Sequence, residues 1–352
     1  MPNISRYVIP KISLKPNKLV LCNEFGIASD TPDYVKQKST SCSKNKPVRE
    51  YHNFILSKKS QIAMKEKINW LYLLSRARYK MTLSNKNIYN FKLSFITLTL
   101  PSEQIHPTSV ITKECFNQFL TEIRTQYKVE NYVWRLEFQS NGNVHYHIVT
   151  DSYIDYYIVR KVWNRIINKL GYVDRFSSVM KSLSFNEYYQ TRYLNNSHIC
   201  KRYGNNKNVI FQKAFDNYTK GVREGWKVPN SVSTDNVTSK SNIAWYVSKY
   251  FSKKGQKQNP CNPLDNEENS FGLRLWYCSQ SLSKLKNIVS YEGEMYFDLW
   301  SLLSEGQKVW KKFYQYCSII WFDFKNLPDY ICSILRNIFY EEANRIGYVY
   351  PT

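Results

Sequence analysis

The dipeptide Asn141–Gly142 lies between two apolar runs, and it constrains the fold more than any other feature of the chain. The runs NYVWRLEFQ before it and VHYHIVT after it are rich in β-branched and aromatic residues, which favour strands. An Asn-Gly pair between two such runs favours a tight hairpin turn. The two strands are therefore predicted to be antiparallel neighbours in one sheet.

The segments around this hairpin predict the rest of a small α+β domain. FKLSFITLTLP (91–101) has the composition of a strand, and KECFNQFLTEIRTQY after Thr112 has an apolar stripe at helical spacing. DYYIVRKVWNRIINKLG predicts a second helix that ends at Gly171. The order strand, helix, strand, hairpin, strand, helix predicts a ferredoxin-like or RRM-like antiparallel sheet with helices packed on one face.

Composition divides the chain into three predicted regions. Residues 1–60 are expected to form a basic, partly ordered arm, and residues 61–280 the α+β domain. This domain carries a polar, Asn-rich stretch at about 180–240, interpreted as an insertion or elaborated loop. SNIAWYVSKYFSKKG then predicts a helix and FGLRLWYCS a further strand. Residues 281–352 are expected to be an aromatic-rich, helical accessory region.

The charge balance favours a nucleic-acid partner. Fifty Lys and Arg residues against 28 Asp and Glu give a formal charge of +22, and cationic side chains release counterions when they neutralise phosphates. Codon bias in an AT-rich genome is the alternative source of the lysines. The eight cysteines include no close pair, which argues against a zinc ribbon or disulfide framework and favours a reducing compartment. No run reaches the roughly 18 apolar residues of a membrane span, so a cytoplasmic protein without a membrane partner is expected.

Two histidines one residue apart form a candidate metal site. In a strand, His145 and His147 point to one face and Tyr146 to the other. Glu137 lies across the hairpin, opposite about position 146 or 147, within reach of the histidines. Two imidazoles and a carboxylate can hold one divalent ion with open positions for water and phosphate oxygen. Alternatively, the histidines are structural and Glu137 pairs with Arg135.

A second candidate group lies in the predicted helix at 244–255. Tyr246 and Tyr250 are one turn apart, and Lys249 flanks them. A nearby ammonium favours the phenolate, which makes tyrosine a possible nucleophile toward phosphorus. Lys253 and Lys254 continue this helix as a candidate DNA-binding patch. The alternatives are that the tyrosines serve packing and that the lysines form a solvated helix end.

Taken in order, FITLTLP (95–101), the His145-Tyr146-His147 triplet and YVSKYFSKK (246–254) resemble the three motifs of the HUH endonuclease superfamily. The histidine motif precedes the tyrosine, as in rolling-circle replication initiators. The Tyr-x-x-x-Tyr spacing and the later FGLRLW run resemble initiators of microvirus-like single-stranded DNA phages and some plasmids. The chain departs from the pattern in its tyrosine between the histidines, in a long stretch before the third motif, and in the lack of a fused Walker A helicase.

The resemblance implies a replication initiator that nicks single-stranded origin DNA. One Mg²⁺ or Mn²⁺ held by Glu137, His145 and His147 would assist attack by a tyrosine, leaving a 5′-phosphotyrosyl intermediate and a free 3′-OH, and the strands would later be rejoined. Host helicase and polymerase are the implied partners, in the cytoplasm of a bacterial host. The alternatives are an HUH-type transposase and a non-catalytic RRM-like nucleic-acid binder, in which Trp134, Phe138 and Tyr146 would stack on bases.

Overall fold

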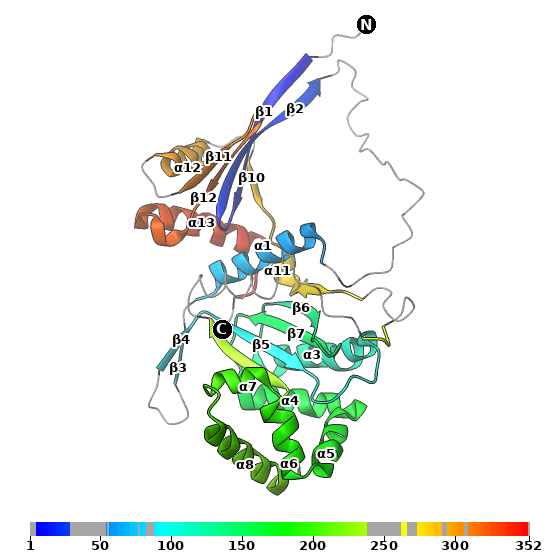
Figure 1. The fold of residues 1–352 in the computed structure, drawn as a ribbon. Helices are drawn as coiled ribbons and strands as arrows, with labels where there is room; N and C mark the ends of the chain where they lie inside the picture. The colour runs from blue at the N-terminus through cyan, green and yellow to red at the C-terminus, as the bar shows by residue number, and fades with distance from the viewer. Residues whose placement is uncertain are drawn as a thin grey trace, which may run out of the picture.

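The computed structural model describes residues 5–28, 54, 56–76, 78–81, 88–237, 262–265, 273–290, 294–305 and 309–350. Within these residues the chain forms two five-stranded antiparallel sheets and one two-stranded sheet, with helices between and around them (Figure 1). The predicted α+β class is confirmed.

One five-stranded sheet, called here the site sheet, has the strand order β8-β5-β7-β6-β9. Its strands are β5 (Leu93–Thr99), β6 (Tyr132–Phe138), β7 (Val144–Thr150), β8 (Val232–Val237) and β9 (Trp276–Cys278). The first four follow the chain order strand, helix, strand, strand, helix, strand, and β7 lies between β5 and β6. This is the predicted ferredoxin-like arrangement. The predicted strand in FGLRLWYCS is β9, which adds to it at the β6 edge.

Two helical segments cover one face of the site sheet. The first comprises α2 (Thr108–Val110), the π-helical turn η2 (Ile111–Phe116) and α3 (Asn117–Tyr127), and the second comprises α4 (Tyr156–Ile167) and the 3-10 turn η3 (Asn168–Leu170). Phe116 stacks on Tyr146, and Phe119 and Trp163 pack beside them. The side chain of Asp155 caps α4 by accepting from Tyr157 N.

The Asn-rich stretch between α4 and β8 is helical. It contains α5 (Tyr172–Ser182), α6 (Phe185–Tyr189), the π-helical turn η4 (Gln190–Leu194), α7 (Ser197–Arg202) and α8 (Lys207–Arg223), and then the edge strand β8. These helices have their own small core, formed by Met180, Tyr188, Tyr193, Ile210 and Ala214. An insertion or elaborated loop was expected at about 180–240; the structure has short helices packed around aromatic residues there, followed by β8 of the site sheet.

The other five-stranded sheet, called here the outer sheet, has the order β10-β1-β2-β12-β11. Its strands are β1 (Ser5–Lys15), β2 (Lys18–Ala28), β10 (Ile288–Ser290), β11 (Trp310–Phe313) and β12 (Cys317–Trp321). The β1–β2 hairpin lies within residues 1–60, where a partly ordered arm was expected. The strands β10, β11 and β12 lie within residues 281–352, where only helices were expected. The helices of that region are α12 (Glu294–Ser304), the 3-10 turn η6 (Phe324–Asn326) and α13 (Asp329–Arg345).

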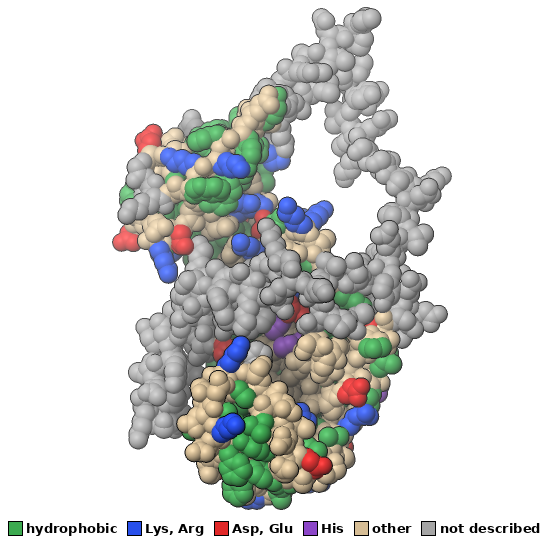
Figure 2. Space-filling model, in the orientation of Figure 1, with side chains coloured by type: hydrophobic (Ala, Val, Ile, Leu, Met, Phe, Trp, Pro, Cys, Tyr) green, Lys and Arg blue, Asp and Glu red, His purple; other side chains and the backbone are tan. Residues whose placement is uncertain are grey.

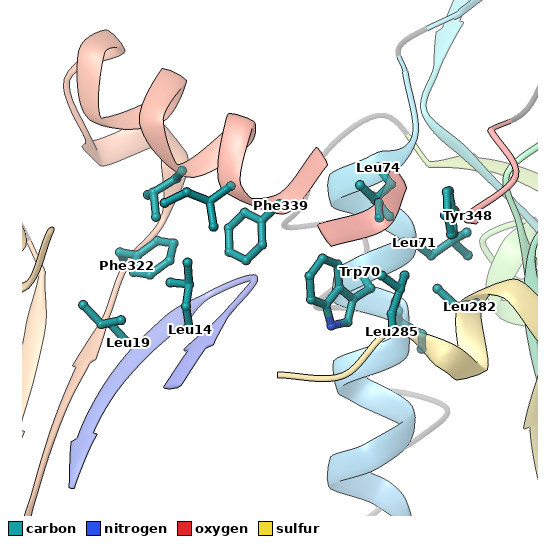
Figure 3. Packing of buried hydrophobic residues seen from close by; sticks show 14 of the residues in the cluster. Leu14, Leu19, Trp70, Leu71, Leu74, Leu282, Leu285, Phe322, Phe339 and Tyr348 are labelled. Atoms are coloured by element: carbon teal, nitrogen blue, oxygen red, sulfur yellow. The ribbon is translucent and has the colours of Figure 1, made fainter. Parts of the chain in front are cut away.

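Helix α1 (Lys58–Leu74) connects the two sheets. Its Trp70 packs edge-on against Phe339 of α13, at 5.2 Å between ring centroids, and Figure 3 shows Phe339 close to Leu14 of the outer sheet. The same core continues into the site sheet through Leu93, Phe95, Val133, Val149 and Cys278. Helix α1 therefore packs on the sheet face opposite α3 and α4. The prediction placed helices on one face only. The remaining elements are α11 (Gln280–Lys284) and the hairpin of β3 (Arg78–Met81) and β4 (Ile88–Phe91).

Candidate functional site

The β6–β7 hairpin determines which side chains share a face. The β-ladder ends at the pair Phe138–Val144, and Gln139 N then donates to Asn143 O, which leaves a loop of three residues with Gly142 at φ 80°. Glu137 therefore lies directly opposite His145. The prediction of position 146 or 147 assumed a two-residue turn, and the third loop residue moves the register by one. A carboxylate opposite Tyr146 would have faced the helices, whereas opposite His145 it faces the histidines.

Glu137, His145 and His147 lie together on the face of the site sheet that α1 partly covers. Glu137 Oε2 is 3.3 Å from His147 Nε2, and the rings of His145 and His147 are 4.4 Å apart between centroids. Arg135 Nη1 contacts the other carboxylate oxygen, Oε1, at 3.0 Å. His147 is 1% exposed. In Figure 2, histidine and acidic side chains lie next to each other near the middle of the molecule.

Two residues of β5 hold His147 in place. Thr97 Oγ1 lies 3.3 Å from His147 Nδ1, and the ring of Phe95 stacks on the imidazole at 5.6 Å between centroids. Because Thr97 engages Nδ1, Nε2 is directed toward Glu137. Thr97 was not among the site residues predicted from the sequence. The signal was present in FITLTLP, where Thr97 and Thr99 alternate with apolar residues and so had to share the face of the histidines.

The charged groups of Arg135 and Glu137 interact strongly because both side chains are buried. The side chains of Arg135 and Glu137 are only 12% and 10% exposed. Burial lowers the pKa of the Arg135 guanidinium below its ordinary value, and the adjacent Glu137 carboxylate opposes that shift. The pair of Glu137 with Arg135 is also observed, but Glu137 does not face the solvent as an ordinary surface residue would, and its carboxylate contacts Arg135 and His147 at the same time.

The donor atoms fit a divalent cation in chemistry, although they are not assembled as a ready-made metal centre. Glu137 Oε2 and His147 Nε2 lie about as far apart as two neighbouring ligands at roughly 2.1 Å from one ion. Over the described residues, no three His, Cys, Asp or Glu side chains converge closely enough to form a complete metal site. The metal role of these three residues stays a prediction.

Tyr146, between the two histidines, is a core residue. It is fully buried on the helical face, its ring stacks on Phe116 at 4.0 Å, and its hydroxyl lies 2.7 Å from Thr112 Oγ1. Burial raises the pKa of Tyr146 far above its usual value near 10. The residue thus occupies the apolar position of the motif because Thr112 of η2 satisfies its hydroxyl.

We expect Tyr146→Phe to lower the free energy of unfolding by about 1 kcal/mol, because the change removes one buried hydrogen bond and keeps the ring. Thr112 still donates to Thr108 O, which limits the loss. Urea unfolding measures the difference. Tyr157→Phe, at a tyrosine that is 69% exposed on α4, is the matched control and should stay within about 0.5 kcal/mol. A loss above about 3 kcal/mol would contradict this account of the hydroxyl.

The second predicted group falls outside the described residues. Tyr246, Lys249, Tyr250, Lys253 and Lys254 all lie between positions 237 and 262, so their predicted roles remain predictions. The structure does describe the three aromatic residues that an RRM-like binder would stack on bases. Trp134, Phe138 and Tyr146 are all buried against the helices, so they are not available to stack on bases as an RRM-like binder requires. None of the helices in the described ranges is long and apolar enough to span a bilayer.

The fold and the comparison with known families together define the class of this domain as that of a replication initiator. The family model described as Replication-associated protein ORF2/G2P, a family of rolling-circle replication initiators, matches residues 93–255. The match starts at β5, includes Glu137, His145 and His147, spans the helical insertion and ends just beyond Lys254. No curated protein and no solved structure showed significant similarity to the chain.

Proposed function

We propose that the protein nicks single-stranded origin DNA through a tyrosine and starts rolling-circle replication from the 3′-OH it releases. The observation that supports this proposal most directly is the grouping of His145, His147 and Glu137 on one face of the sheet, inside a domain of a replication-initiator family. A buried carboxylate between an imidazole and a guanidinium is costly for a protein that merely binds DNA.

In this proposal the phenol oxygen of Tyr246 attacks the scissile phosphorus. The bond from phosphorus to the 3′ oxygen breaks, the tyrosine keeps the 5′ phosphate, and the 3′ oxygen takes up a proton. Lys249 would stabilise the phenolate, and Tyr250 would make the second cut after one round of synthesis. Attack by the free 3′-OH on the phosphotyrosine then rejoins the strand. The phosphodiester energy is conserved in the covalent link, so the joining step consumes no ATP.

Glu137, His145 and His147 would hold one Mg²⁺ or Mn²⁺, which when bound supplies positive charge beside the scissile phosphate. Thr97 orients His147, and Arg135 orients the carboxylate of Glu137. Lys253 and Lys254 would contact the DNA backbone. Extension from the 3′-OH would require a helicase and a polymerase from the host, in whose cytoplasm the protein would act. An HUH-type transposase would share this chemistry, and the family match favours an initiator.

The test is incubation of the protein with Mn²⁺ and an end-labelled single strand that carries the origin of its own replicon. We expect a covalent protein–DNA adduct and a shortened labelled strand on a denaturing gel. His145→Ala should reduce adduct formation at least ~100-fold, because it removes one proposed ligand. His106→Ala is the matched control, since His106 contacts Tyr172 away from the site and should leave the yield unchanged. An absence of adduct with the unchanged protein would refute the proposal, and full activity of His145→Ala would refute the metal site.

A further inference from the structure

A second candidate site lies beside helix α1, where the site sheet meets the outer sheet. It is a cavity of about 310 Å³ between α1, the start of β5, η6 and α13. Its walls include Tyr72 and Asn69 of α1 and Lys92 just before β5. The wall also includes Phe324 and Lys325 of η6 and Arg336 of α13. Only Lys92 of these six residues is close to the family-matched segment, which begins at residue 93.

The wall pairs aromatic rings with cations. Lys92 Nζ lies 4.0 Å from the centroid of the Tyr72 ring, and the Arg336 guanidinium lies 5.7 Å from that of Phe324. A ring beside a fixed cation offers the two contacts that a nucleotide makes, stacking for the base and charge neutralisation for the phosphate. The size also suits a small ligand, since ligand cavities begin at about 300 Å³.

The charge of the cavity favours an anion. Lys92, Lys325 and Arg336 face a single carboxylate, that of Asp323. Asp323 Oδ1 already accepts from Lys325 N at the start of η6, so this carboxylate has a structural role as a cap. Three cations against one capping carboxylate leave a net positive wall.

The cavity is connected to the histidine site by one strand. Lys92 directly precedes β5, and Thr97, which contacts His147, is five residues further along it. At about 3.4 Å per residue this separation is about 17 Å, or roughly five stacked nucleotides. Helix α1, which forms part of the cavity wall, covers the same sheet face as the histidines. Leu93 and Phe95 between the two sites are buried in the core with α1, so a single strand that contacts both sites would pass around this core and not along β5.

We propose that this cavity binds one nucleotide of the DNA strand that the histidine site processes, so that the α1–η6–α13 junction contributes to single-strand DNA binding. The proposal rests on the function proposed above. It assigns a binding role to a region of the chain that lies almost entirely outside the family-matched domain.

The test compares two pairs of exposed cations in the full-length protein. Lys325→Gln/Arg336→Gln removes two charges from the cavity. The control, Lys161→Gln/Lys227→Gln, removes two charges from another basic cavity, of about 290 Å³, on the opposite sheet face at α4. The probe is a fluorescent oligothymidylate of about 20 nucleotides, longer than a typical ~4–16-nucleotide binding site. Fluorescence anisotropy measures the Kd of each variant.

We expect the cavity pair to raise the Kd about tenfold or more and the control pair to raise it less than about threefold. Phe324→Leu, which keeps the charges, should weaken binding at least about fivefold through lost stacking. Equal weakening by both pairs, or none by the cavity pair, would overturn the proposal. A third outcome would also overturn it: Lys325→Gln/Arg336→Gln abolishes saturable binding of free thymidine monophosphate but leaves the Kd for the oligonucleotide unchanged. The cavity would then bind a free nucleotide and not the DNA strand. If the unchanged protein forms the covalent adduct but the cavity pair binds normally, only this inference fails; without any adduct, the proposed function fails.

Discussion

The double variant Tyr246→Phe/Tyr250→Phe is expected to form no covalent adduct with origin DNA. Both phenol oxygens are removed while the rings are kept, so the fold should be retained and the nucleophile lost. Removal of a catalytic nucleophile typically costs several orders of magnitude, and we expect a drop of at least about 10³-fold in adduct yield. The measurement is a denaturing gel after incubation with Mn²⁺ and the labelled strand, with binding of the uncleaved strand measured in parallel.

The single variants distinguish a one-tyrosine from a two-tyrosine enzyme. If both tyrosines act, Tyr250→Phe should make the first cut and fail to complete the second strand transfer. If only Tyr246 acts, Tyr250→Phe should match the unchanged protein in both steps. Tyr157→Phe, at an exposed tyrosine on the helical face, is the control and should retain full activity. An undiminished adduct from the double variant would show that a different residue attacks the phosphate.

Glu137→Gln is expected to lower the free energy of unfolding by about 3 kcal/mol when the metal is removed with a chelator. The change leaves the Arg135 guanidinium buried without its countercharge, and loss of one partner of a buried ion pair costs about 3–5 kcal/mol. Urea denaturation measures the loss. The double variant Arg135→Gln/Glu137→Gln should recover part of it, because it removes both buried charges.

Glu122→Gln is the matched control for this carboxylate. Glu122 pairs with Arg165, whose side chain is 52% exposed, so water can solvate the remaining guanidinium. We expect a loss below about 1 kcal/mol. Equal losses at Glu122 and Glu137 would mean that burial does not strengthen the Arg135–Glu137–His147 group. The activity assay on Glu137→Gln separately tests its proposed metal role, since the adduct should also be lost under conditions in which the variant is folded.

The parts of the fold that sequence could predict are those with local signals. The Asn141–Gly142 turn, the alternation in VHYHIVT and the apolar stripe at Phe116 and Phe119 each specify a neighbour close in sequence. They yielded the antiparallel hairpin, the helical face and the shared face of Glu137 and the histidines. The predicted register was wrong by one residue because an Asn-Gly pair occurs in three-residue loops as well as in two-residue turns. The sequence alone does not distinguish the two loop lengths.

The outer sheet carried no comparable signal. Cys22 of β2 pairs with Cys317 of β12, 295 residues away, so no local pattern links them. The strands β11 and β12 are short and only partly buried, and β11 includes two lysines. The helices between α4 and β8 were not predicted for a different reason: their polar surface dominates the composition, and their core of five buried residues is too small to produce a clear helical period. Thr97 was not predicted because threonine is common in strands for its β-propensity, so its presence there does not indicate a hydrogen bond to a histidine.

The pairing of β2 with β12 also sets an order of events during synthesis. At about 5–20 residues per second a ribosome needs roughly 15–60 s to translate the 295 residues between these partners. The initiator domain at 93–255 emerges within that interval, whereas β2 waits for its neighbour. The cavity beside α1 is completed later still, when Arg336 of α13 leaves the exit tunnel. A nascent chain can thus assemble its histidine face before the cavity that we propose binds a nucleotide is complete.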